Sequence, residues 1–69
     1  MPSSVIRAHR YDAAAMRLDI NFVSGARYSY FDVPEQVAQA LASAPSKGRY
    51  FQHTIRDRFP YARTARFRH

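Results

Sequence analysis

The strongest constraint on the fold is an alternation of apolar and polar side chains over residues 16–22. The apolar positions are Met16, Leu18, Ile20 and Phe22. This two-residue period is typical of a β-strand with one buried face. Residues 26–31 repeat the period with Tyr28 and Tyr30, and a Ser-Gly pair separates the two runs. The sequence therefore predicts a β-hairpin.

The length of the hairpin loop decides which side chains share a face. A two-residue loop places Ile20 opposite Ser29, whereas a three-residue loop over 23–25 places Ile20 opposite Tyr28. The longer loop joins apolar to aromatic side chains and puts its glycine in the left-handed position of a G1 bulge. A one-residue slip would turn every side chain to the other face. We therefore predict the three-residue loop, with Tyr28 and Tyr30 on the core side.

Residues 4–11 are expected to form an edge strand, and the second half is expected to be helical. A first helix starts at Pro34 and stops before Pro45, and Ser46 caps a second helix over about 47–58. The apolar rows of the two helices are Val37, Leu41 and Ala44, followed by Phe51, Ile55 and Phe59. The predicted fold class is α+β, a three-stranded antiparallel meander followed by two helices packed on one face.

The chain has 69 residues and no cysteine, which allows one small domain without disulfides or a thiolate zinc site. We assign residues 1–61 to the domain and 62–69 to a basic, flexible C-terminal tail. No apolar run approaches the roughly 20 residues that span a bilayer. No secretory signal is visible at the start, so we expect a cytoplasmic protein without a membrane partner.

The positive charge is concentrated in the second half of the chain. Residues 36–69 hold seven Lys and Arg residues and a single acid, Asp57, so they carry the whole net charge of +6. Such a one-sided field favours polyanionic partners, although a solvated, solubilising surface has the same composition. The candidate phosphate-binding cations are Lys47, Arg49, Arg56, Arg58, Arg63, Arg66 and Arg68.

Two motifs add detail to this hypothesis, and each has a structural alternative. Ser46 and Gly48, with the cations around them, could cradle a phosphate at a helix N-terminus, or they could form an ordinary capped helix start. Aromatic side chains among the arginines could stack on unpaired bases. The stacking candidates are Tyr28, Tyr30, Phe31 and Tyr61. Tyr28 and Tyr30 are favoured as core residues with hydroxyls at the rim, and Phe31 lies on the opposite face.

No catalytic or metal-binding pattern is present in the sequence. His53 and Asp57 have the spacing of an orienting pair on a helix, but no nucleophile has a visible base partner. A solvent-exposed pair without a catalytic role is the favoured interpretation. We therefore expect no enzyme activity, no metal and no cofactor.

Several short motifs follow one another in a distinctive order. They include Tyr28-Ser29-Tyr30, Ala44-Pro45-Ser46-Lys47-Gly48-Arg49-Tyr50-Phe51 and Ile55-Arg56-Asp57. With this set the chain resembles the KTSC domain, which is named for its occurrence at the C-terminus of some lysyl-tRNA synthetases. The resemblance covers roughly residues 3–61 and leaves 62–69 outside. It implies a small α+β fold, and the fusion to a synthetase favours RNA as a partner.

The sequence thus leads to two functional hypotheses. The first is a small, non-catalytic nucleic-acid-binding module, RNA before DNA, that acts through its basic second half. The alternative is a protein–protein interaction module that docks on an acidic surface of a larger enzyme through an exposed edge of the first or third strand.

Overall fold

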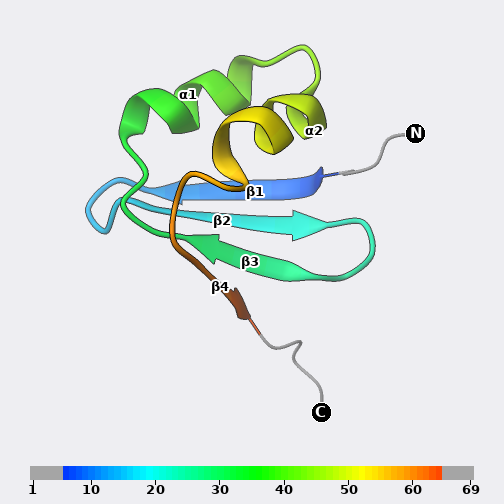
Figure 1. Cartoon of the computed structure of the whole chain (residues 1–69), viewed down its shortest axis with the longest axis horizontal. Coiled ribbons are helices and arrows are strands. Elements are labelled where there is room, and N and C mark those ends of the chain that lie inside the picture. Colours follow the sequence, from blue (N-terminus) through cyan, green and yellow to red (C-terminus); the bar gives the residue numbers. More distant parts are fainter. Residues whose placement is uncertain (1–5, 65–69) are drawn as a thin grey trace.

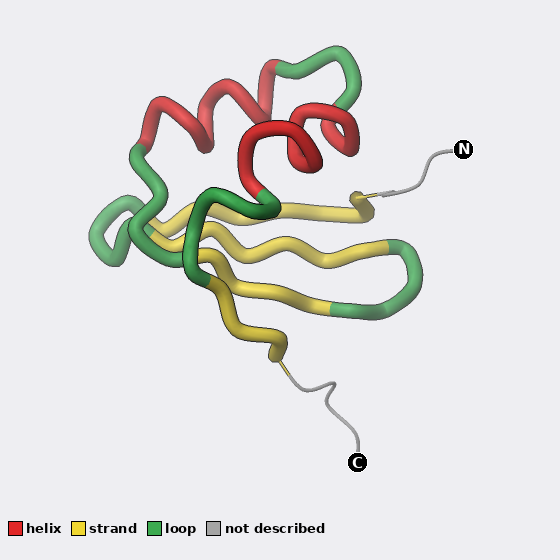
Figure 2. The backbone as a smooth tube through the Cα atoms, in the orientation of Figure 1, coloured by secondary structure: helices red, strands yellow, loops and turns green. Residues whose placement is uncertain are grey.

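The computed structural model describes residues 6–64, which form one antiparallel sheet and two helical segments. In chain order the elements are β1 (Ile6–Asp12), β2 (Arg17–Phe22), β3 (Arg27–Tyr30), α1 (Glu35–Ser43), α2 (Lys47–Tyr50), the π-helical turn η1 (Phe51–Ile55) and β4 (Tyr61–Thr64). The helices cover one face of the sheet, and the other face has no covering element among these residues (Figure 1). Figure 2 shows the same two layers as a helical layer above the strands. The predicted α+β class is confirmed.

The hairpin between β2 and β3 has the predicted register. Ile20 pairs with Tyr28 and Leu18 with Tyr30. The loop closes through the Phe22 N–H, which donates to the Ala26 carbonyl over 2.9 Å. The glycine of the loop has a φ of 100°, a conformation that costs glycine little and other residues more. The three-residue loop is therefore confirmed, and both tyrosines lie on the helix-facing side of the sheet.

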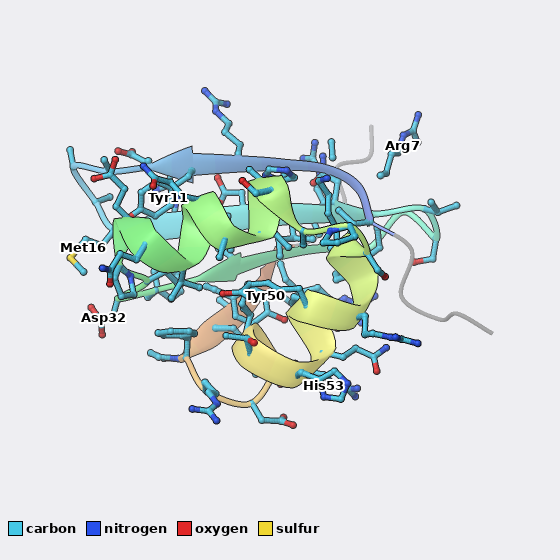
Figure 3. All side chains as sticks on the ribbon, turned by 90° about the horizontal axis from the view of Figure 1, so that it is seen from above. Arg7, Tyr11, Met16, Asp32, Tyr50 and His53 are labelled. Carbon is cyan, nitrogen blue, oxygen red and sulfur yellow. The ribbon has the colours of Figure 1, made fainter. Side chains whose placement is uncertain are left out.

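The core lies between this face and the helices. Leu18 and Ile20 from β2 pack against Leu41 of α1 and Ile55 of η1, and all four are fully buried. Tyr30, Val33 and Phe51 complete the buried cluster. Tyr11 closes one side, where its hydroxyl donates to the Val33 carbonyl over 2.6 Å. Figure 3 shows this side chain between β1 and α1.

The expectation of a three-stranded sheet is wrong, because β4 adds a fourth strand beside β3. Tyr61 pairs with Tyr30 and Arg63 with Tyr28. The Phe31 N–H also donates to the Pro60 carbonyl over 2.8 Å, which starts this pairing. β4 thus takes in Ala62, Arg63 and Thr64, which the sequence assigned to the tail, while residues 65–69 lie outside the described residues. The third strand has no free edge; the sheet edges are β1 and β4.

The second helix is shorter and wider than predicted. Its first turn is α-helical, but from Phe51 the chain follows a π-helical turn, with the Arg56 N–H donating to the Phe51 carbonyl over 2.9 Å. The turn keeps Phe51 and Ile55 facing the core. The helix ends near Arg56 instead of residue 58, so Phe59 packs on the core from the connection to β4. Within residues 6–64 no helix has the length and apolar character needed to cross a bilayer.

Two residues other than glycine have a left-handed backbone, Met16 with φ 53° and Asp32 with φ 60°. Both lie at the same end of the sheet (Figure 3). The backbone of Met16 is fixed there by two hydrogen bonds, from its N–H to the Ala13 carbonyl and from the Val33 N–H to its own carbonyl. A methionine in this region is strained because its Cβ approaches the backbone.

Replacing Met16 with asparagine is expected to stabilise the protein. Asparagine is several-fold enriched in the left-handed region, which corresponds to about 0.5–1 kcal/mol. The Met16 side chain is 41% exposed, so little packing is lost. For a domain of this size the melting temperature should rise by about 4 °C in a thermal denaturation followed by circular dichroism. Met16→Ala, which lacks the short polar side chain that lets asparagine hydrogen-bond locally in this region, is the control and should give no gain. Equal melting temperatures for Met16→Asn and Met16→Ala would contradict the strain argument.

Candidate functional site

A cleft of about 550 Å³ opens on the helix-facing side of the sheet, between η1 and the paired strands β3 and β4. Half of its lining residues are aromatic. The aromatic side chains that line it are Phe22, Tyr28, Tyr30, Phe51 and Tyr61. We call it the tyrosine cleft. The strand pairing explains its position, since the residues of β3 and β4 that stand opposite each other point to the same face.

Three tyrosine rings contact one another in the cleft. The ring centroids of Tyr28 and Tyr30 are 6.3 Å apart, and that of Tyr61 lies 5.6 Å from Tyr28 and 5.5 Å from Tyr30. These separations are typical of favourable aromatic pairs. The rings differ greatly in exposure, because Tyr30 is 3% exposed, Tyr28 is half-buried and Tyr61 is 57% exposed. Tyr30, predicted as a stacking candidate, is therefore a core residue whose ring is closed to a base; Tyr61 is the open ring.

Burial also sets the chemistry of the Tyr30 hydroxyl. Removal from water, followed by the proximity of Tyr28, raises the pKa of Tyr30 to about 12. The hydroxyl consequently keeps its proton throughout the physiological pH range and is able to donate a hydrogen bond.

Two arginines accompany the tyrosines. The Arg63 guanidinium carbon lies 5.9 Å from the centroid of the Tyr28 ring, within the range of a cation–π contact. Arg56 follows η1 and lines the cleft from the helix side. Within residues 6–64 neither arginine forms an ion pair, although Asp57 also lines the cleft. The cleft therefore combines an accessible aromatic ring with the guanidinium group of Arg56, and Arg63 lies beside it over the Tyr28 ring while bordering the groove on the other face.

The predicted phosphate cradle lies elsewhere. The Ser46 hydroxyl accepts a hydrogen bond from the Arg49 N–H over 3.4 Å, which is the helix cap that the alternative interpretation expected. The cap occupies an N–H group that a phosphate would need. None of Ser46, Lys47, Gly48 and Arg49 lines the tyrosine cleft. Ser46 and Arg49 instead border a small apolar pocket of about 360 Å³ with Tyr50 and His53.

The remaining predicted cations are not gathered at one place. Arg58 is exposed in the turn after η1 and does not line the cleft, and Arg66 and Arg68 lie outside the described residues. The structure thus divides the basic residues of the second half, with Arg56 and Arg63 at the cleft and Arg49 at the smaller pocket.

The helix-free face of the sheet carries a second groove, of about 720 Å³. Its centre is an ion-pair network in which the Arg17 guanidinium lies 3.2 Å from Asp19 and 3.8 Å from Asp12. Ser29 donates to the same Asp19 carboxylate over 2.7 Å. Phe31, the last stacking candidate, lines this groove and is 37% exposed. The carboxylates neutralise Arg17, whereas Arg10 and Arg27, which also line this groove, form no ion pair within residues 6–64.

The histidine pair does not form. The described part of the chain contains no hydrogen bond or ion pair between His53 and Asp57, and Figure 3 shows His53 at the outer edge of the molecule. The π-helical turn contributes to this, because its i→i+5 hydrogen bonding takes residues four apart out of alignment, and Asp57 lies beyond the end of η1. Among residues 6–64 no group of three or more His, Cys, Asp or Glu side chains is placed to hold a metal ion.

Sequence reasoning did not identify Phe51, Gln52 and Asp57 as cleft residues. These residues line the cleft because η1 lies beside β4. The sequence predicted a longer α-helix in place of η1 and no strand in place of β4. The only available signal was the spacing of Tyr61 and Arg63, which repeats the two-residue period of Tyr28 and Tyr30.

Comparison with known proteins gives consistent matches. The family model described as KTSC domain matches residues 2–59. The chain is 45% identical over 58 residues to a lysine–tRNA ligase of Nostoc sp., a match that covers 84% of this chain and 10% of the ligase. It is 40% identical over 57 residues to a protein of Tsukamurella paurometabola, covering 83% of this chain and 85% of that protein.

The fold has a solved counterpart in the crystal structure of a KTSC domain protein from Yersinia pestis. The TM-score is 0.86 and the sequence identity 35%, with 94% of this chain and 92% of the other covered. The chain spans only about a tenth of the length of the curated ligases that it matches. The family match covers most of the chain, the two relatives are 40% and 45% identical to it over the matched segments, and the folds agree. The chain belongs to the KTSC domain family.

Proposed function

We propose that this protein binds single-stranded nucleic acid, RNA before DNA, through the tyrosine cleft. The observation that carries the proposal is the exposed Tyr61 ring, held against Tyr28 and Tyr30 with Arg63 over the Tyr28 ring. Proteins that bind single strands without strong sequence preference combine such aromatic rings, on which bases stack, with cations that follow the backbone. RNA comes before DNA because lysine–tRNA ligases that contain a related segment act on an RNA.

The charge distribution supports the same interface. Arg56 and Arg63 are free of ion pairs within residues 6–64, so an approaching phosphate does not have to displace a carboxylate. On the helix-free face Arg17 is paired with two acids, whereas Arg10 and Arg27 have no ion pair within residues 6–64, so the aromatic rings and not charge alone distinguish the tyrosine cleft. The proposed role needs no catalytic residue.

Salt dependence tests the electrostatic part of this proposal. Binding of a fluorescent single-stranded RNA, measured by anisotropy, should weaken steeply as salt is added, because each neutralised phosphate releases counterions. Arg56→Ala and Arg63→Ala should each reduce the slope of log affinity against log salt by about 0.7, the value for one contact with a single strand.

Arg7→Ala is the matched control, since it removes the same charge from an exposed position. Figure 3 shows Arg7 at the β1 side of the molecule, opposite His53. Its slope should equal that of the unmodified protein. An affinity that is independent of salt would rule the interface out. So would an Arg7→Ala variant whose salt slope falls as much as the slopes of Arg56→Ala and Arg63→Ala.

A protein-docking role is the second candidate, and one observation favours it. The chain corresponds to about a tenth of the lysine–tRNA ligases that it matches, so related units occur as parts of much larger enzymes. The free sheet edges are β1 and β4, and an edge strand can add a strand from a partner. Co-purification with a protein that survives nuclease treatment would favour this role over RNA binding.

A further inference from the structure

The hydroxyl of Tyr30 makes no hydrogen bond within the part of the chain that the structure describes. Tyr30 is 3% exposed and lines the tyrosine cleft. Tyr11 is different, because its hydroxyl donates to the Val33 carbonyl. In the described part of the chain no fully buried side-chain polar atom lacks a partner. The Tyr30 hydroxyl must therefore reach the small part of Tyr30 that is open, which faces the cleft.

A nearly buried tyrosine whose hydroxyl lacks a hydrogen-bond partner is suited to bind a ligand. A ligand that fills the cleft would cover this hydroxyl, and because burying a polar group without a hydrogen bond is costly, a ligand that offers an acceptor there is favoured. The aromatic contacts hold the ring in place, with Phe51 at 5.5 Å and an interplanar angle of 77° on one side and Tyr61 at 5.5 Å on another. The hydroxyl is consequently a preorganised donor.

The surroundings define the shape and chemistry of that ligand. The cleft volume of about 550 Å³ falls within the range of small-molecule sites. The exposed Tyr61 ring offers a flat apolar surface, and Arg56 offers a positive charge on the helix side. The Tyr61 ring suits a planar ring, the Tyr30 hydroxyl suits a polar ring edge, and Arg56 suits an attached anion. An unpaired nucleotide has all three of these parts.

We propose that the tyrosine cleft takes one unpaired nucleobase of a single strand, and that the Tyr30 hydroxyl hydrogen-bonds to a carbonyl oxygen or ring nitrogen on the edge of that base. The inference rests on the proposed function and deepens it. Stacking on Tyr61 accepts any base, because every base has an aromatic face. The Tyr30 hydroxyl adds a position-specific contact that distinguishes bases by the groups on their edges.

Tyr30→Phe tests the inference, since it removes one oxygen and keeps the ring. Its affinity for four short RNA homopolymers should be compared with that of the unmodified protein by fluorescence anisotropy. The unmodified protein should prefer one base, and Tyr30→Phe should lose about three- to tenfold in affinity for it, as expected for one hydrogen bond. The salt slope should not change. With an RNA of the same length that lacks bases, the two proteins should bind equally.

Tyr11→Phe is the matched control, because it removes a hydroxyl that is engaged within the fold. It should keep the base preference. Thermal melting should show that Tyr30→Phe is at least as stable as the parent, since the lost hydroxyl has no partner among residues 6–64. A mononucleotide of the preferred base should bind more weakly than the RNA strand. Equal affinities would show that the ligand is a free nucleotide and would overturn the assignment of single-stranded nucleic acid as the ligand.

The outcomes distinguish a failure of the Tyr30 base contact from a failure of the proposed nucleic-acid binding. If RNA binds with the expected salt dependence but Tyr30→Phe retains the full preference, the base contact is overturned and the stacking site stands. If no RNA or DNA binds to the unmodified protein at low salt, both proposals fail.

Discussion

Ile20→Ala is expected to cost about 4 kcal/mol of folding free energy, a large share of the stability of a domain this small. Ile20 is fully buried and lies on β2, an interior strand, between His9 and Tyr28. Truncating a buried isoleucine costs about 2–5 kcal/mol through lost transfer energy and the cavity left behind. Alanine is also less suited to a strand than a β-branched residue, which adds up to about 1 kcal/mol. Typical stabilities of about 0.1 kcal/mol per residue leave little reserve.

Urea denaturation followed by far-ultraviolet circular dichroism measures this loss. Ile20→Val, which removes one methylene, should cost about 1 kcal/mol. Val23→Ala in the hairpin loop is the surface control, because Val23 is 58% exposed, and its cost should stay within about 0.5 kcal/mol. If Ile20→Ala and Val23→Ala unfold at the same urea concentration, the assignment of Ile20 to the core is wrong.

Tyr61→Ala is expected to weaken binding of single-stranded RNA about ten- to hundredfold. Stacking of a base on an aromatic side chain contributes about 1–3 kcal/mol by alanine substitution, and Tyr61 is the most exposed ring of the tyrosine cleft. Tyr61→Phe keeps the stacking surface and should keep most of the affinity. Equilibrium titration by anisotropy at fixed salt gives these numbers, with circular dichroism to show that each variant remains folded.

Phe31→Ala is the matched control for the other face of the sheet. Phe31 is an exposed aromatic residue, and it lines the groove around Arg17 and Asp19 instead of the tyrosine cleft. Its loss should leave RNA affinity unchanged. The reverse result, with Phe31→Ala defective and Tyr61→Ala normal, would move the interface to the helix-free face.

Local patterns in the sequence were sufficient to predict much of the fold. The pairing of Ile20 with Tyr28 followed from the apolar alternation and one glycine, since both strands and their loop are neighbours in the chain. The Ser46 cap followed from residue type alone. β4 was missed because its four residues are too few to define a period, and its partner β3 lies on the other side of two helices in the sequence.

The candidate site was predictable only in part, for the same reason. Tyr28 and Tyr30 were placed on the correct face, but the nearness of Tyr61 and Arg63 to them depends on the pairing of β3 with β4, and that of Arg56 depends on where η1 ends. The row of Phe51 and Ile55 fits an α-helix and a π-helical turn equally well, so the sequence did not indicate where the helix would end. The site therefore arises from contacts between distant segments, which single-sequence patterns do not encode.

The pairing of β4 with β3 has a consequence for how binding and folding are linked. Short loops connect β1, β2 and β3, whereas β4 reaches β3 across both helices, so its docking closes the longest loop between paired strands in the described chain. Tyr61 and Arg63 belong to that strand, and the cleft is complete only when it is docked. A ligand held by these side chains would shift the docking equilibrium towards the closed sheet, and part of its binding energy would be spent on ordering the edge of the domain.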